Sequence, residues 1–182
     1  SLTSITLPES VTDIGMEAFS NCNRLTDITL SKGLKSIADY AFSGCSSLTA
    51  ITLPENLTLI GGGAFYGCNS LTAINIPDSV RVIGGGAFSK CSSLTKVTIG
   101  NGVTIGEGAF CECAKLKEAI IGNKVTIGSG AFLRGVNTLD PRNPGQFLNV
   151  GSKAVYDPNI GFYRYEYLSD LKVLKIGSQA TI

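Results

Sequence analysis

The sequence predicts a repeat solenoid: a right-handed, β-rich stack of about seven layers, each with a short parallel strand and a single helical turn. Two ladders of residues indicate this fold. Leucines recur every 23 residues, dropping to 22 in the last step, at Leu2, Leu25, Leu48, Leu71, Leu94 and Leu116. Phenylalanines recur with nearly the same spacing at Phe19, Phe42, Phe65, Phe88, Phe110 and Phe132. A fixed period of roughly 20–29 residues with a leucine-containing strand is typical of leucine-rich repeats.

The first part of each unit reads as a strand, and the third unit illustrates it over residues 48–53. Ile51 and Leu53 are two residues apart, so their side chains share the inward face, while the residues between them face outward. Pro54 follows directly. Proline has no amide to donate to a ladder, so we expect the strand to end there.

The second part of the unit returns to the interior after this strand. Leu57 and Ile60 form a second extended segment, which a run of glycines interrupts. Ala64, Phe65 and Cys68 then follow at a spacing that suits one helical turn with its side chains directed inward. A single unit cannot bury these groups alone. Stacked layers, with parallel strands roughly 4.8 Å apart, bury each group between its copies.

Five of the six cysteines form a third ladder. Each lies three residues after a ladder phenylalanine, at Cys22, Cys45, Cys68, Cys91 and Cys113, and Cys111 alone lies off this register. One thiol per layer at one register predicts buried free cysteines, which behave as small hydrophobic residues. Neighbouring layers would bring two thiols into bonding range, but a whole ladder cannot pair.

The repeat pattern divides the chain into three parts. Residues 1–132 hold six regular repeats, residues 133–170 depart from the pattern, and residues 171–182 match the start of a further repeat. The middle part is either an insertion or a strongly degenerate repeat. The repeat pattern returns after it with a strand expected over residues 171–176, which match residues 2–7.

Composition excludes several classes of protein. The formal net charge is +1, without the clustered basic face that nucleic-acid binding requires. The chain holds no apolar run long enough for a transmembrane helix. It also contains no histidine, which removes Ser–His and Cys–His nucleophiles and most catalytic zinc sites. We therefore expect no enzyme activity.

Two short motifs suggest cofactors, but both are better explained by the repeat. The glycine runs at 61–63 and 84–86 lack the Gly-Lys-Ser/Thr ending of a phosphate loop and lie at the repeat's turn position. Cys111, Glu112 and Cys113 resemble a metal clip, but Cys113 belongs to the buried ladder and a structural zinc needs about four ligands. We expect neither a metal nor a cofactor.

The outward positions of the first strand offer one candidate binding surface. Its main column, called here the polar column, consists of Thr29, Thr52, Asn75 and Thr98. Threonine also simply suits an exposed strand. The column is therefore either an ordinary solvated face or a shallow polar site for a protein or a glycan.

The second candidate lies in the irregular part of the chain. Alternation from residue 162 to 167 places Tyr163, Tyr165 and Tyr167 on one face and Arg164 on the other. Tyrosine and arginine are enriched at interfaces, and insertions in repeat proteins often lie on the binding face. Alternatively, these aromatic residues pack on the solenoid and cover its irregularity.

The repeat unit also resembles a known family. The motif Leu-Thr-x-Ile-x-Leu/Ile-Pro-x-Ser-Val-x-x-Ile-Gly-x-x-Ala-Phe-x-x-Cys is similar to the BspA-like leucine-rich repeats, and residues 1–22, 47–68 and 70–91 match it almost throughout. Ser31, Gly100 and Gly122 depart from it at the proline position. The resemblance implies a curved solenoid of bacterial secreted or cell-surface proteins that are associated with adhesion. It implies no catalytic residues.

Together these features predict a non-catalytic binding or adhesion module of a secreted or cell-surface bacterial protein, with a protein or glycan partner. The alternative is a purely structural spacer that displays another domain.

Overall fold

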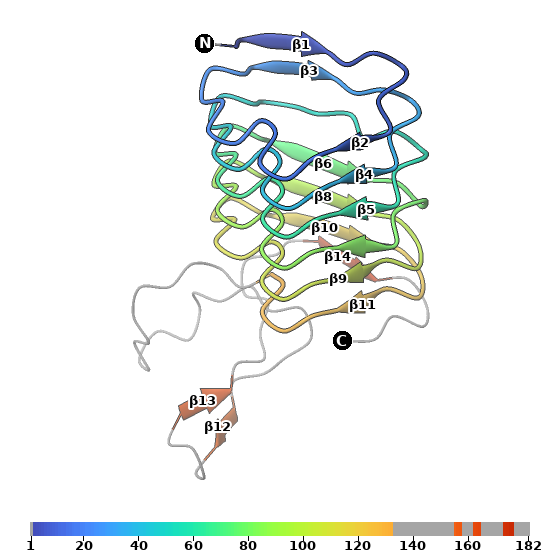
Figure 1. Cartoon of the computed structure of the whole chain (residues 1–182). Helices are drawn as coiled ribbons and strands as arrows, with labels where there is room; N and C mark the ends of the chain where they lie inside the picture. Colours follow the sequence, from blue (N-terminus) through green and yellow to red (C-terminus); the bar gives the residue numbers. More distant parts are fainter. Residues whose placement is uncertain (1, 133–154, 158–161, 165–172, 177–182) are drawn as a thin grey trace.

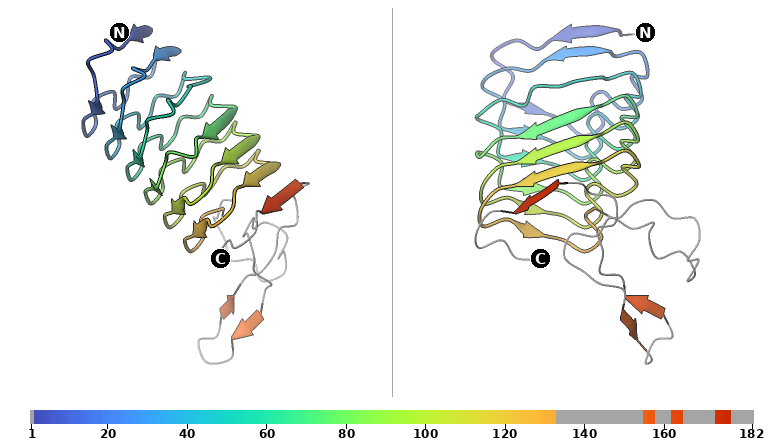
Figure 2. Two further views of the ribbon diagram at one scale, coloured as in Figure 1. Left: turned by 90° about the vertical axis from the view of Figure 1, so that its right-hand side faces the viewer. Right: turned by 180° about the vertical axis from the view of Figure 1, so that it is seen from behind.

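The chain folds into a stack of parallel-stranded layers, seen in a computed structural model that describes residues 2–132, 155–157, 162–164 and 173–176 (Figure 1). Each layer between residues 2 and 132 runs once around the stack and adds one short segment to each of two walls. The views from the side and from behind show these segments in register from layer to layer (Figure 2). The predicted leucine-rich-repeat solenoid is confirmed.

The second wall is a continuous parallel sheet with one strand from each layer. Its order is β11-β9-β7-β5-β4-β2, so the part of the chain that the structure describes contributes six layers to this wall, slightly fewer than the predicted seven. Each strand is two residues long and ends on a buried isoleucine. The strands are β2 (Asp13–Ile14), β4 (Ser36–Ile37), β5 (Leu59–Ile60), β7 (Val82–Ile83), β9 (Thr104–Ile105) and β11 (Thr126–Ile127).

The first wall is interrupted at the third layer. It consists of a two-stranded sheet, β1-β3, and a four-stranded sheet, β14-β10-β8-β6. The prediction of a strand over residues 48–53 is wrong, because these residues form no strand. The strands that do form are β1 (Ser4–Thr6), β3 (Asp27–Thr29), β6 (Ala73–Ile76), β8 (Lys96–Ile99), β10 (Glu118–Ile121) and β14 (Val173–Ile176).

The outward side chains give a physical reason for this interruption. Ala50 occupies the same column as Asp27 of the layer before and Ala73 of the layer after. Alanine contributes almost nothing to the cross-strand side-chain pairs that stabilise a sheet. Ala50 lies between Asp27 and a second alanine, Ala73, whereas Ala73 also has Lys96 of β8 as a partner. Ile51 is only half-buried, whereas its counterparts Ile28 and Ile74 are buried.

The third segment of each layer is a column of turns in place of the predicted single helical turn. Two residues four positions apart adopt a left-handed backbone, such as Gly63 (φ 58°) and Gly67 (φ 69°) in the third layer. A left-handed residue cannot continue a right-handed helix. Instead, alternate amides bond within the turn or to the next layer, as from Phe65 N–H to the Ala87 carbonyl at 2.7 Å. We call these stacked segments the turn column.

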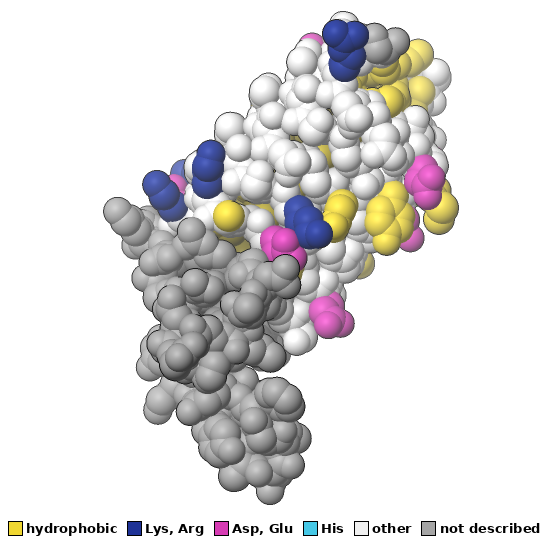
Figure 3. Space-filling view, turned by 90° about the vertical axis from the view of Figure 1, so that its left-hand side faces the viewer, with side chains coloured by type: hydrophobic (Ala, Val, Ile, Leu, Met, Phe, Trp, Pro, Cys, Tyr) yellow, Lys and Arg dark blue, Asp and Glu magenta, His cyan; other side chains and the backbone are white. Residues whose placement is uncertain are grey.

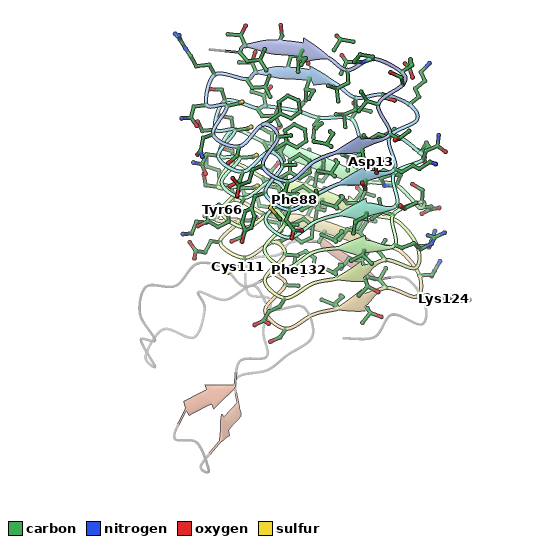
Figure 4. The ribbon with its side chains drawn as sticks, in the orientation of Figure 1. Asp13, Tyr66, Phe88, Cys111, Lys124 and Phe132 are labelled. Carbon is green, nitrogen blue, oxygen red and sulfur yellow. The ribbon has the colours of Figure 1, made fainter. Side chains whose placement is uncertain are left out.

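The core between the walls and the turn column is built from the predicted ladders. The six phenylalanine rings from Phe19 to Phe132 stack with centroids 5.0–5.1 Å apart and interplanar angles of 2–10°. Phe88 and Phe132 are labelled within this interior (Figure 4). All six cysteines are free thiols. Cys68 donates to the carbonyl of Phe42 in the preceding layer at 3.3 Å, and the other buried ladder thiols do the same.

The one-residue shortening of the last repeats is absorbed without loss of register. Val82 and Ile83 pair with Thr104 and Ile105 as the strands before them do. The shorter segments contain an additional left-handed residue, Gly102 (φ 69°) in the fifth layer and its counterpart Lys124 (φ 55°) in the sixth. The tighter turn therefore keeps the inward side chains buried.

Toward the C-terminus the chain adds one strand to the first wall and forms a separate pair of antiparallel strands. β14 pairs with β10 in parallel, with Val173 opposite Glu118, where the sequence predicts a further repeat. β12 (Val155–Asp157) and β13 (Phe162–Arg164) pair antiparallel, with Tyr156 opposite Tyr163.

Candidate functional site

The polar column lies on the first wall, where the alternation of the strands directs side chains outward. Thr29, Thr52 and Asn75 are exposed and Thr98 is half-buried. The buried neighbours of these residues hold their backbone in place, with Ile28 and Ile74 at most 5% exposed. A rigid stack thus presents four polar side chains, one per layer.

The upper two residues of the column line a hollow at the interruption of the sheet. This hollow has a volume of about 370 Å³, and its wall on one side is β3 with the following residues up to Lys32. The opposite wall is formed by residues 50–52 and Pro54. Thr29 and Thr52 therefore lie on opposite walls of this hollow. Asp27 and Lys32 bring one negative and one positive charge to its rim.

The lower two residues line a second hollow of about 320 Å³ at the ends of β6 and β8. Asn75 and Thr98 belong to it, together with Asp78 and Asn101 of the turns that follow. The Asp78 carboxylate accepts hydrogen bonds from the Asn101 amide at 2.8 Å and from its side chain at 3.1 Å. These bonds tie the two turns together, so the rim of this hollow is pre-organised.

Several charged side chains interact with residues of a neighbouring layer. Lys96 and Glu118 form an ion pair at 3.2 Å across β8 and β10. On the second wall, hydrogen bonds from Ser36 and Thr12 lower the pKa of the Asp13 carboxyl. On the turn column, a hydrogen bond with Tyr66 raises the pKa of Lys90. These interactions fasten neighbouring layers.

Burial disfavours the reactive thiolate form of Cys45, Cys68 and Cys111. Burial raises the pKa of Cys45 to about 11, and burial raises the pKa of Cys68 further. Cys111 is half-buried at the edge of the turn column (Figure 4), and there too desolvation raises the thiol pKa. Since the thiolate is the reactive form, these groups stay protonated and inert near neutral pH. Among the described residues no cluster of three or more potential ligands is suited to a metal ion.

The predicted aromatic candidates are placed only in part. Tyr163 and Arg164 lie in β13, opposite Tyr156 and Val155 of β12. Tyr165 and Tyr167 lie outside the described residues. The binding role of this segment therefore stays a prediction.

Sequence reasoning missed two features of the surface. Asp27 and Lys32 were not among the candidates, because only the interruption of the sheet brings them to one hollow. On the turn column, Tyr40 is 48% exposed and has a left-handed backbone (φ 55°), a position where later layers carry glycine. The space-filling view of that side shows separate hydrophobic and charged side chains among polar groups and backbone (Figure 3). No signal in the repeat pattern identifies these residues.

The fold and the repeats define a leucine-rich-repeat scaffold, a class of proteins that are generally non-enzymatic and commonly serve as surface or binding modules. Residues 1–104 match the model of the BspA type leucine rich repeat region in six copies. The chain belongs to this family. No curated protein matches it significantly.

Solved structures agree with this assignment. A leucine-rich repeat protein of T. pallidum (TpLRR) is 38% identical, with a TM-score of 0.68 over 72% of this chain and 62% of that one. A leucine-rich repeat protein of Bacteroides ovatus is 30% identical, with a TM-score of 0.57 over 75% of this chain and 42% of that one. The pneumococcal vaccine antigen PcpA, at 23% identity and a TM-score of 0.54, covers 70% of this chain and 31% of its own, and shares the fold. The chain thus spans less than two thirds of each of these proteins.

No helix within the described residues is long and apolar enough to cross a membrane.

Proposed function

We propose that this chain is a non-catalytic binding module of a bacterial secreted or cell-surface protein, and that the polar column contacts a protein or glycan partner. One observation carries the proposal. The four predicted residues of the column line two hollows, Thr29 and Thr52 the first and Asn75 and Thr98 the second. Hollows with a few polar groups over an apolar base are the usual form of ligand sites.

The rigidity of the scaffold supports this role. Asn75 and Thr98 lie on the paired strands β6 and β8, over the buried side chains of Ile74 and Val97, so little entropy is lost when this part of the column engages a partner. A binding surface built on repeats also grows by one column position per layer, which suits an extended partner.

A direct test measures binding to an array of glycans and a panel of immobilised extracellular-matrix proteins. The test variant replaces Thr29, Thr52, Asn75 and Thr98 by lysine. A matched control replaces Thr58, Thr104 and Thr126 by lysine as well. These residues are exposed and lie on or beside the second wall. The proposal expects loss of binding in the first variant and retention in the control. Equal binding of both variants would rule out the column.

The aromatic segment is the second part of the proposal. Deletion of residues 133–170, and separately replacement of Tyr163, Tyr165 and Tyr167 by serine together with Arg164→Ser, tests it in the same assay. Loss of binding in both assigns the contact to this segment. If no variant binds less than the unmodified chain, the partner site lies elsewhere, which is the result expected of a spacer that displays another domain.

The proposed location has its own test. Antibodies raised against residues 1–132 should label intact cells of the source bacterium or detect the protein in its culture medium. Labelling only after lysis would contradict a surface or secreted location.

A further inference from the structure

The interruption of the first wall leaves a row of backbone groups without partners inside the sheet. In β1-β3, the Leu7 amide donates to the Thr29 carbonyl at 2.9 Å. One layer further, the corresponding bond would join Leu30 to Thr52. Within the described residues, no backbone hydrogen bond links residues 50–53 to β3 or to β6. Residues 50–53 therefore have unpaired backbone amides and carbonyls on the side of β3 and on the side of β6.

The directions of these free groups follow from the strands that do pair. Leu7 is an inward residue and directs its amide to the next layer, so its counterpart Leu30, and Ile28 two residues before it, direct their backbone groups to the third layer. By the same alternation, Ala50 and Thr52 direct theirs back to the second layer. These two rows face each other across the 370 Å³ hollow.

Both ends of the opening are fastened. At one end the Ser47 hydroxyl donates to the Asn23 carbonyl at 2.6 Å. At the other, the Asn56 side chain donates to the Lys32 carbonyl at 2.9 Å. The turn column and the second wall also keep the two layers joined, as from Tyr40 N–H to the Gly62 carbonyl at 2.9 Å. The opening is thus a bounded slot that is part of the fold, and it admits only a short segment.

Resting on the proposed function, we propose that this slot receives a short extended peptide segment of a protein partner, parallel to β3, with a basic residue toward its N-terminus and an acidic residue toward its C-terminus. An extended peptide repeats its donors and acceptors every two residues, roughly 6.6 Å, which matches the free rows of the slot. Addition of a strand to an exposed edge is an established mode of peptide recognition. A glycan lacks this periodic pattern.

The charges of the slot set the order of the peptide. Asp27 lies at the start of β3 and Lys32 lies beyond its end, and both are exposed. A parallel peptide brings its N-terminal part to Asp27 and its C-terminal part to Lys32. A basic residue near the N-terminus of the peptide and an acidic residue near its C-terminus therefore complement the slot. A peptide with the reverse order would place like charges together at both ends.

A displayed library of random seven-residue peptides, selected on the purified chain, identifies the probe, and a synthetic consensus peptide gives the dissociation constant. The basic-to-acidic order is the expected enrichment. In the variant D27K with K32E the net charge is unchanged, and the preference should reverse by at least tenfold in favour of peptides with swapped charges. Enriched peptides whose affinity does not respond to this swap would overturn the proposal.

The backbone contribution is tested separately. Thr52→Pro removes one free donor without breaking a hydrogen bond of the solenoid, and should weaken the consensus peptide roughly 3- to 10-fold, the value of one such bond. Thr52→Ala keeps the donor and removes only the side chain of this column residue, so the loss of affinity in Thr52→Pro beyond that in Thr52→Ala measures the contribution of the backbone amide. N-methylation of the central peptide amides should weaken binding to the unmodified chain as well, which covers the case that the proline variant misfolds.

The outcomes separate the slot from the broader proposal. Peptide or partner binding that depends on Asn75 and Thr98 but not on Asp27, Lys32 or the Thr52 amide sustains a binding role for the column and refutes the slot. Binding only to glycans does the same. Absence of binding to peptides, glycans and matrix proteins alike refutes both proposals.

Discussion

The turn column and the first wall are built from the same repeats, but only the turn column is continuous. Every described layer of the turn column bonds to the next, from Phe19 N–H to the Ala41 carbonyl at 2.7 Å through to Phe110 N–H to the Ala131 carbonyl at 2.6 Å. In the first wall the same stacking fails at residues 50–53. The inward residues of the turn column are regular and keep its layers stacked, whereas the outward residues of the first wall differ from layer to layer. Variation that the core tolerates is therefore concentrated on the surface proposed to bind.

The largest effect that distinguishes these regions is expected from the phenylalanine stack. Phe65→Ala removes a fully buried ring between two neighbours at 5.0 and 5.1 Å. We expect the free energy of unfolding to fall by about 3–5 kcal/mol. Urea denaturation followed by circular dichroism measures it, and Leu59→Ala, at a side chain that is 40% exposed, is the control. A loss below about 1 kcal/mol for Phe65→Ala would show that the stack is not the core.

The thiol ladder predicts a loss of stability in alkali. The pKa of Cys45 is raised from 9.0 to about 11 in the folded chain. A group whose folded pKa is raised stabilises the fold fully below its unfolded pKa, and this contribution is lost as pH rises toward the folded pKa. Stability should therefore decline between pH 9 and 11.

Denaturation at a series of pH values tests this in the unmodified chain and in Cys45→Ala. The variant should show a weaker decline, because it lacks one titrating thiol. Identical pH dependence of the two proteins would be inconsistent with a buried Cys45.

A smaller effect is expected from the ion pair on the intact part of the first wall. Lys96 and Glu118 have side chains that are 47% and 33% exposed, and such surface pairs contribute only about 0.2–1 kcal/mol. A double-mutant cycle with Lys96→Ala and Glu118→Ala should give a coupling in this range, reduced at high salt. A coupling of several kcal/mol would mean that the continuous part of this wall depends on side-chain charge.

The inward half of the fold is predictable because one register is repeated. The leucine, phenylalanine and cysteine ladders fix which side chains face the core, and the structure places Leu48, Phe65 and Cys68 there with no exposure. Layers that share these residues must stack in parallel, so the continuity of the second wall follows as well.

The outward half is less predictable. The third unit departs from the repeat motif only at Asn56 and Leu57, which follow the predicted strand, yet this strand does not form. Pairing there depends on outward contacts worth fractions of a kcal/mol each, and Ala50 supplies almost none. The turn geometry was missed for another reason: Glu17, Tyr40 and Lys90 hold left-handed backbones without being glycine. The hollows follow from the interruption and the turns, so the sequence contains the residues of the site but not its shape.

Native-state hydrogen exchange of the free chain tests the contrast between the two regions most directly. The amides of Leu30 and Thr52 should exchange quickly because no backbone acceptor holds them. The amides of Phe65, bonded to the Ala87 carbonyl at 2.7 Å, and of Gly100, bonded to the Ile76 carbonyl at 2.9 Å, should be strongly protected. Protection of Leu30 and Thr52 equal to that of Gly100 would show that the first wall is continuous and would contradict this account.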